Sequence, residues 1–324
     1  MNPEIVLINP WIYDFAAYDL WAKPLGLLYL ASRIRAMGFT VHFIDCLDVH
    51  NPLMQYAGYK KKPIRRFYGT GKYWKQNALK PSQLSSISRT YNRYGISPQL
   101  FKQELKKAKK PKAILVTSLM TYWYPGVFEA IHLAKKIYPD IPVILGGIYA
   151  ALCPEHARTY SGADLIISSS DRLWPAELSA VLKSISDFTH DEKIEPFHPY
   201  PAFDLLTKID YISLLSSFGC PFNCPYCASH YLSPLLYKRE PLELFEEVLY
   251  WHKNYHVMDF AFYDDALLLD AANHICIFLE ELLKTDLTLR FHCPNGLHIA
   301  CIDKDVAELL CRAGFLTIRL GFET

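Results

Sequence analysis

The chain has 324 residues, of which 51% are hydrophobic and 21% are charged, and its formal net charge is +1. This length favours two domains, and the apolar fraction is large enough for two sizeable cores. No apolar run reaches the length of a membrane span, and the first residues lack the basic start and long apolar core of a secretory signal, so we expect a cytoplasmic protein with no membrane partner.

The basic residues are concentrated in one segment, 51–112, which holds 12 Lys and 4 Arg against a single acidic residue, Glu104. Aromatic residues such as Phe67 and Trp74 lie among these charges, a pattern that also occurs in segments that bind nucleic acid. A solvated insertion that docks on the acidic remainder of the protein explains the same charge, and no nucleic-acid motif accompanies it. We favour the insertion and do not expect a nucleic-acid partner.

The N-terminal part of the chain alternates between strand-like and helical segments. Apolar, strand-like runs are expected at 4–9, 40–44, 113–117, 142–145 and 164–168. Helices are expected from Pro24 to a cap at Gly38 and from Pro125 to about Tyr138. This alternation predicts an α/β domain over 1–185, with a parallel sheet covered by helices on both faces. The polar, proline-bearing stretch 186–208 predicts a linker.

Three cysteines, Cys220, Cys224 and Cys227, follow in one short loop with the spacing C-x3-C-x2-C, after a short buried strand at 213–217. Nine cysteines in a chain without an export signal favour metal or redox chemistry over disulfides. A 4Fe–4S cluster has four irons, so three thiolates leave one iron open to a substrate or cofactor. A zinc site or a plain electron-transfer cluster is the alternative, but zinc prefers paired C-x2-C knuckles and the sequence has no second one.

Strand-like and helical segments alternate again beyond the cysteines. Helices are expected at 241–252, 271–283 and 305–313, and strands at 259–263, 287–292 and 315–321. Each of these strands ends in polar residues, and in a (β/α) barrel such ends meet at the mouth that holds the active site. The sequence therefore predicts a partial barrel of about four β-α units over 209–324.

The run SSFGCPFNCPYCASH resembles the cluster loop of the radical S-adenosylmethionine (radical SAM) superfamily, including an aromatic residue, Tyr226, before the third cysteine. The resemblance implies that Cys220, Cys224 and Cys227 bind a 4Fe–4S cluster whose open iron is chelated by SAM. It implies that one electron cleaves SAM to a 5′-deoxyadenosyl radical. It also implies a reductant such as flavodoxin or ferredoxin, and a small-molecule or other substrate that the sequence does not identify.

The later strand ends resemble the SAM contacts of the same superfamily. Asp264 and Asp265 match the place where backbone groups bind the methionine amino group, although a paired aspartate alone would suit a strand-end cap. Asn295 lies where a polar side chain can reach the ribose, and Glu323 matches a glutamate that often contacts SAM. With Tyr226, these residues make up the expected SAM-binding set.

The N-terminal domain resembles the Rossmann-like cobalamin-binding domain that precedes many radical SAM barrels. The match runs from Ser118 through Gly146-Gly147 to Pro154-Glu155-His156-Ala157. It implies candidate cobalamin contacts at Ser118, Gly146 and Gly147, because glycines let a backbone approach a bulky ligand closely. A domain that keeps this fold without cobalamin stays open as the alternative.

The loop after the first strand departs from the cobalamin pattern. Proteins that supply a histidine to cobalt carry D-x-H-x-x-G there, whereas this chain reads Asn9-Pro10-Trp11-Ile12-Tyr13-Asp14. We therefore expect no histidine ligand, and aromatic residues such as Trp11, Tyr122 or Trp123 along the lower face of the corrin.

The resemblance implies a radical SAM enzyme, with methyl transfer to an unreactive carbon if cobalamin is bound and other C–H functionalisation if it is not. A barrel of this superfamily has six β-α units and we count four, which suggests a truncated chain. A non-catalytic iron–sulfur protein or an inactive remnant is therefore the alternative function.

Overall fold

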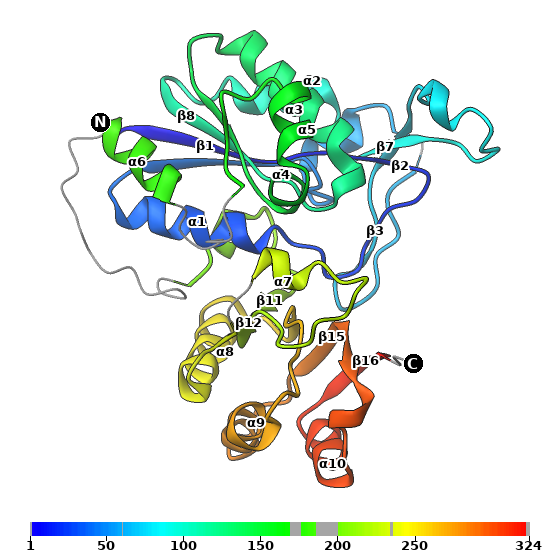
Figure 1. The fold of residues 1–324 in the computed structure, drawn as a ribbon, viewed down its shortest axis with the longest axis vertical. Coiled ribbons are helices and arrows are strands. Elements are labelled where there is room, and N and C mark those ends of the chain that lie inside the picture. The colour runs from blue at the N-terminus through cyan, green and yellow to red at the C-terminus, as the bar shows by residue number, and fades with distance from the viewer. Residues whose placement is uncertain (1, 60, 169–175, 186–199, 234–235, 322–324) are drawn as a thin grey trace. The chain divides into compact units, whose positions relative to one another are not determined.

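The structure is a computed structural model that describes residues 2–59, 61–168, 176–185, 200–233 and 236–321 (Figure 1). The chain forms two compact units. The first unit comprises Met1–Asp19, Pro24–Arg66 and Thr70–Lys208, and the second comprises Leu20–Lys23, Phe67–Gly69 and Ile209–Thr324. No helix in the described part of the chain has the length and apolar character that crossing a membrane requires.

The first unit is built on a parallel sheet of five strands in the order β10-β9-β8-β1-β4. The strands are β1 (Glu4–Asn9), β4 (Thr40–Asp45), β8 (Pro111–Val116), β9 (Val143–Leu145) and β10 (Leu165–Ile166). Both faces of the sheet are buried, because Val6 and Ile8 pack in one core cluster and Ile5 and Leu7 in another. Burial on both faces explains why these strands read as continuous apolar runs. The predicted parallel sheet is confirmed.

Helices cover the two faces of this sheet (Figure 1). On one face lie α2 (Pro98–Leu105), α3 (Tyr124–Ile137), α4 (Ile148–Leu152) and α5 (Pro154–Tyr160), and on the other lie α1 (Leu25–Ala36) and α6 (Ala176–Ser184). The hydroxyl of Ser97 caps α2 by accepting a hydrogen bond from the Leu100 amide at 3.1 Å. The helices predicted from Pro24 and Pro125 are present, with ends that differ by one or two residues.

The basic segment is partly ordinary sheet domain and partly an insertion. Its last residues form α2 and the beginning of β8, while the remainder forms small antiparallel sheets and two 3₁₀ turns. The segment contributes η1 (Pro52–Tyr56), β5 (Gly71–Lys72), β6 (Lys75–Asn77), η2 (Ser82–Leu84) and β7 (Asn92–Tyr94). Strands β2 (Ile12–Asp14) and β3 (Tyr18–Asp19), which precede it in the chain, pair with β7 and β5. Aromatic residues anchor the insertion, since the buried Trp74 donates its indole N–H to the Val49 carbonyl at 3.1 Å.

The second unit contains a parallel sheet of four strands in the order β11-β14-β15-β16. The strands are β11 (Ile212–Leu214), β14 (Asp259–Phe262), β15 (Arg290–His298) and β16 (Phe315–Gly321). The helices are α7 (Ser229–Leu232), α8 (Pro241–Tyr255), α9 (Ile275–Leu283) and α10 (Lys304–Arg312), and a short antiparallel pair consists of β12 (Ser217–Phe218) and β13 (Tyr237–Lys238). Helices α8, α9 and α10 lie on one side of the sheet (Figure 1). This order of strands and helices confirms the predicted partial barrel.

Two strands of this unit differ from the sequence-based expectation. The predicted strand 213–217 is divided into β11 and β12, because the chain turns at Leu215 and Ser216. The predicted strand 287–292 begins later and continues to His298, because β15 resumes pairing with β16 at Leu297 after a shift in register. Asn295 therefore lies within a strand and not beyond its end.

The side of this sheet opposite the helices is covered by two short segments from far earlier in the chain. Ala261 lies between Phe260 and Phe262 in β14, so it points to the opposite side from them, and it packs with Trp21, Tyr68 and Tyr211. Trp21 stacks on Tyr68 with ring centroids 5.5 Å apart and on His292 at 4.7 Å. The sequence placed both segments in the first domain.

Two further observations bear on the predicted domain boundaries. Residues 200–208, predicted to be linker, belong to the first unit, where the Ala202 amide donates to the Leu28 carbonyl at 3.0 Å. The preceding part of the predicted linker, 186–199, lies outside the described residues.

Position 69 requires glycine, because its φ is +86° and a Cβ there would lie 2.4 Å from Asp210 Cβ.

Replacing Trp21 by alanine should destabilise the second unit. The variant removes a ring that is 2% exposed and stacked on two others, which costs about 3–5 kcal/mol in free energy of unfolding. Urea unfolding followed by far-ultraviolet circular dichroism measures this loss. Leu79→Ala, at a side chain that is 95% exposed, is the control and should leave the midpoint unchanged. Equal midpoints for the two variants would show that Trp21 is dispensable for this packing.

Candidate functional site

The three cysteines lie on a segment whose two ends are paired with each other. Strand β12 pairs antiparallel with β13, so that Ser217 lies opposite Lys238 and Phe218 opposite Tyr237. Gly219, with a φ of +79°, follows β12 and directly precedes Cys220. The segment therefore leaves the sheet and returns to it at one place, just beyond the carboxyl end of β11. In α/β folds, ligands bind at this end of parallel strands.

The thiols of Cys220, Cys224 and Cys227 are free and half-buried. The Cys227 amide donates to the Cys224 carbonyl at 3.0 Å, and the Ser229 amide donates to Cys227 Sγ at 3.4 Å. Burial raises the pKa of the Cys220 thiol, and the charges of Asp265, Cys227 and Cys224 raise it further. Deprotonation of Cys220 is therefore costly in this environment, and coordination to a metal ion offsets that cost.

The donor set fits an iron–sulfur cluster. Thiolates are soft ligands and are the usual holders of 4Fe–4S clusters, and a backbone amide that donates to a ligating sulfur tunes the cluster potential. Within the described residues, no three metal-ligating side chains converge on a single point. Each thiolate of a cubane binds its own iron atom, so these sulfurs do not need to share one point.

A buried carboxylate holds the chain at the entry to the cysteine segment. Both carboxylate oxygens of Asp264 accept the Ser216 amide at 3.1 Å, and Oδ1 also accepts the hydroxyls of Ser216 and Ser217 at 2.6 Å each. Burial raises the pKa of Asp264, although these hydrogen bonds oppose the shift. The Asp264 side chain is thus turned toward β12, whereas Asp265 is exposed.

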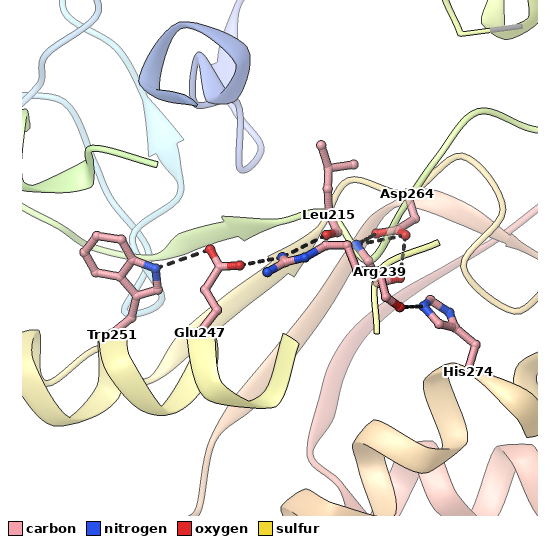
Figure 2. A network of polar contacts seen from close by, with 7 residues as sticks. Leu215, Arg239, Glu247, Trp251, Asp264 and His274 are labelled. Atoms are coloured by element: carbon pink, nitrogen blue, oxygen red, sulfur yellow. Dashed lines mark hydrogen bonds and ion pairs between the residues drawn. The ribbon is translucent and has the colours of Figure 1, made fainter. Parts of the chain in front are cut away.

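A buried ion pair lies beside this carboxylate (Figure 2). Arg239 Nη1 lies 2.5 Å from Glu247 Oε2, and the two side chains are 1% and 0% exposed. Arg239 Nη1 also donates to the Leu215 carbonyl at 3.2 Å, and Trp251 Nε1 donates to Glu247 Oε1 at 3.4 Å. Figure 2 shows His274 at the other end of the network, where its Nε2 donates to the Arg239 carbonyl at 3.0 Å. Burial lowers the pKa of His274, which favours the neutral ring.

The remaining residues expected to bind SAM have different surroundings. Asn295 is exposed and donates its Nδ2 to the Tyr263 carbonyl at 2.8 Å, which joins β15 to the end of β14. Tyr226 is 71% exposed. Glu323 lies outside the described residues. The assignment of these residues, and of the backbone at Asp264 and Asp265, to SAM stays a prediction.

The residues expected to contact cobalamin lie together at the ends of β8 and β9. Ser118 Oγ donates to the Gly146 carbonyl at 2.7 Å. Gly147 has a φ of +90°, and a Cβ there would lie 2.4 Å from the Ser118 carbonyl oxygen, so the fold itself requires this glycine. A Cβ on Gly146 would meet only Ile167 Cβ, at 3.9 Å. The chain does not require glycine at 146, and the space beside it fits the close approach of a ligand.

A small hollow lies where the strand order of the first sheet reverses, between the ends of β1 and β8. It is lined by Asn9, Pro10, Trp11, Ile12, Leu47, Leu119, Trp123 and Val127. Open α/β sheets bind ligands at this reversal point. Trp11 is 1% exposed, donates its indole N–H to the Ile96 carbonyl at 2.7 Å and packs against the tilted ring of Phe101, with centroids 4.8 Å apart. Contrary to the expectation that it faces a corrin, the ring of Trp11 is part of the buried core. The side chain of Tyr122 is exposed.

The sequence reading missed the network around Arg239. The helix that begins at Pro241 buries Leu244, Glu247, Val248 and Trp251. A glutamate three residues from Leu244 and four from Trp251 lies on the face that includes both. A charge at such a position needs a buried partner, and that requirement was the signal available in the sequence.

No protein-family model matches the chain. An uncharacterised methyltransferase of Pyrococcus horikoshii is 23% identical over 261 residues, which cover 71% of this chain and 56% of that protein. The hopanoid C-2 methylase of Rhodopseudomonas palustris is 27% identical over 203 residues, which cover 57% of this chain and 37% of that protein. The chain thus spans about half the length, or less, of these relatives.

Among solved structures, the chain is similar to TsrM of Kitasatospora setae, a radical S-adenosylmethionine methyltransferase solved with its tryptophan substrate and a SAM analogue. The TM-score is 0.61 at 14% sequence identity, and the match covers 97% of this chain and 58% of that one. The match is one of fold, and it agrees with the parallel α/β sheet domain followed by a partial barrel that the sequence predicted.

Asp264→Asn should remove a pH-dependent loss of stability. The folded-state pKa of Asp264 is raised. Its contribution to the free energy of unfolding is therefore fully present below the unfolded pKa of about 3.9, and it is lost as pH rises through the folded pKa. The variant should therefore gain stability relative to the native protein as pH rises above about 4. Urea titrations at a series of pH values measure the difference.

Asp270→Asn is the matched control, because hydrogen bonds from Asn273 and Lys238 lower the pKa of this exposed carboxyl. The contribution of Asp270 is present above the unfolded pKa and is lost as pH falls through the folded one, so the trend has the opposite sign. If the stability differences of the two variants changed with pH in the same direction, Asp264 would not be a buried carboxyl with a raised pKa.

Proposed function

We propose that this chain is a radical SAM enzyme that methylates or otherwise functionalises an unreactive C–H bond. The observation that carries the proposal is the placement of three free thiols on one segment at the carboxyl end of β11, in a fold shared with a radical SAM methyltransferase. The P. horikoshii and R. palustris relatives carry the names methyltransferase and methylase, which supports methyl transfer.

The cysteine residues would hold the metal centre. Cys220, Cys224 and Cys227 would each bind one iron of a 4Fe–4S cluster and leave the fourth iron to SAM. The chemistry that this cluster supplies when bound is one electron for the reductive cleavage of SAM to a 5′-deoxyadenosyl radical. The Ser229 amide, 3.4 Å from Cys227 Sγ, stabilises negative charge on that sulfur. A small electron-transfer protein such as flavodoxin or ferredoxin would deliver the electron.

The neighbouring strand ends would bind and orient SAM. Asp264 and Asp265 follow the end of β14, and Asn295, within the adjacent strand β15, donates its side-chain Nδ2 to the Tyr263 carbonyl. Polar groups held in this way are already ordered before a ligand binds, which lowers the entropic cost of orienting it. Tyr226 and Glu323 complete the proposed set.

Cobalamin is the proposed second cofactor, held by the first unit and supplying a methyl carrier when bound. The open space beside Gly146 supports this assignment. Gly147 and Ser118 would act indirectly, because their mutual contact fixes the backbone at Gly146. The loop after β1 offers no histidine, so we propose that the chain supplies no histidine to cobalt.

Alanine at Cys220, Cys224 or Cys227 should prevent cluster assembly and abolish SAM cleavage, because each thiolate holds a different iron. The native protein, reconstituted anaerobically with iron and sulfide and reduced with dithionite, should show a paramagnetic signal and release 5′-deoxyadenosine from SAM. Cys311→Ala, at an exposed cysteine, is the control and should behave like the native protein.

Two other outcomes of this experiment are informative. A cluster that assembles in the native protein but never cleaves SAM would favour the alternative, a non-catalytic iron–sulfur protein. Native protein that takes up no iron would refute the proposed metal centre.

Gly146→Ala and Gly147→Ala should separate cofactor binding from folding. A methyl at 146 adds only an ordinary contact within the chain, so stability should change by less than about 0.5 kcal/mol. The same methyl should lower retention of hydroxocobalamin by about tenfold or more, because overpacking a contact costs about 1–3 kcal/mol. Alanine at 147 should destabilise the fold by more than about 1 kcal/mol, since φ is +90° and Ser118 is in the way. Visible spectra after desalting measure retention, and no corrinoid on the native protein would remove cobalamin from the proposal.

A further inference from the structure

We propose that the buried pair Arg239–Glu247 is a positioning device that clamps together the two ends of the cysteine-bearing segment and thereby sets how the three thiols are presented to the cluster. The inference rests on the proposed function, since it assigns a purpose to residues that touch none of the proposed ligands. Arg239 and Glu247 are positioning residues because they act through the backbone of Leu215 and Ser216.

At the entry to the segment, every polar group of Ser216 has a partner within the described residues. Its amide and hydroxyl donate to Asp264, and its carbonyl accepts the Arg239 amide at 2.9 Å. The preceding carbonyl, on Leu215, accepts Arg239 Nη1 at 3.2 Å. Asp264 follows β14, so the neighbouring strand holds the chain on one side and Arg239 holds it on the other.

At the exit, Arg239 directly follows β13 and is bonded through its main chain and its side chain. Its carbonyl accepts His274 Nε2 at 3.0 Å, and its guanidinium contacts both Leu215 and Glu247. Glu247 lies in α8 and His274 directly before α9. The exit of the segment is therefore fixed to two helices, and the same residue reaches across to the entry.

The burial of this pair indicates a requirement for geometry. Two charges removed from water gain little net stability from their attraction, because the cost of desolvation is of similar size. Apolar residues would stabilise the same place equally well. A guanidinium differs from an apolar side chain in offering several donors in a fixed plane, so it can bind Glu247 and the Leu215 carbonyl at once. That second contact is the feature that an apolar replacement lacks.

The decisive variant is the double substitution Arg239→Met with Glu247→Leu, which removes both charges and keeps the bulk of the side chains. We expect it to fold, with an unfolding midpoint close to that of the native protein. In metal-free protein, hydrogen exchange at the amides of 216–218 and 237–239 should become faster by about tenfold or more. After anaerobic reconstitution, an iron chelator should strip the cluster faster by a similar factor, and the paramagnetic signal should broaden.

Arg239→Lys is the second variant, for use if the double variant does not fold. Lysine keeps the charge opposite Glu247, but its ammonium donors rotate freely, whereas the planar Nη1 of Arg239 directs its bonds to Glu247 and to the Leu215 carbonyl in fixed directions. It should therefore fold and show the same faster exchange and faster cluster loss. Glu281→Gln removes one partner of an exposed pair with Lys284 on α9, and as the control it should change neither measurement.

The clamp and the proposed function fail in different ways. Native exchange rates and native cluster loss in a folded double variant, or in folded Arg239→Lys, would overturn the clamp and leave the iron–sulfur assignment intact. Native protein that takes up no iron would refute the proposed function. The exchange measurement would still report whether Arg239 and Glu247 order the segment, because it is made without metal.

Discussion

At the end of β11 the backbone leaves the sheet inside the protein, where water cannot satisfy its polar groups. The chain supplies the missing partners from a buried carboxylate, Asp264, and a buried guanidinium, Arg239, whose charge is balanced by Glu247. The cysteine-bearing segment begins and ends at this meeting point. A segment with little regular structure can therefore carry three thiols in a defined place, because its two ends are fixed to two strands and two helices.

A second constraint concerns the opposite side of the same sheet. Small or polar residues such as Ala261 and His292 point to that side, and they cannot form a core by themselves. Trp21 and Tyr68 supply the rings that cover them. The second unit therefore includes two segments that lie more than 100 residues earlier in the chain than the strands they cover.

The first unit illustrates how one dipeptide can serve two purposes. Gly147 is required by the fold, because its positive φ and its approach to Ser118 leave no room for a side chain. Gly146 has an ordinary backbone conformation and open space beside it, so the chain gives no reason of its own for a glycine there. Residues that look equivalent in a motif therefore differ in what their substitution would affect, which is stability at one position and ligand approach at the other.

The sequence alone determined the class of fold, because apolar runs of strand and helix length report local periodicity and burial on both faces of a parallel sheet. It also determined the three thiols, because ligand type and spacing are properties of a single short segment. It could not determine that Glu247 pairs with Arg239, that Asp264 turns its carboxylate to Ser216, or that Trp21 belongs to the second unit. Those contacts join residues distant along the chain or on different elements, and only the tertiary structure decides which buried charge or ring meets which partner.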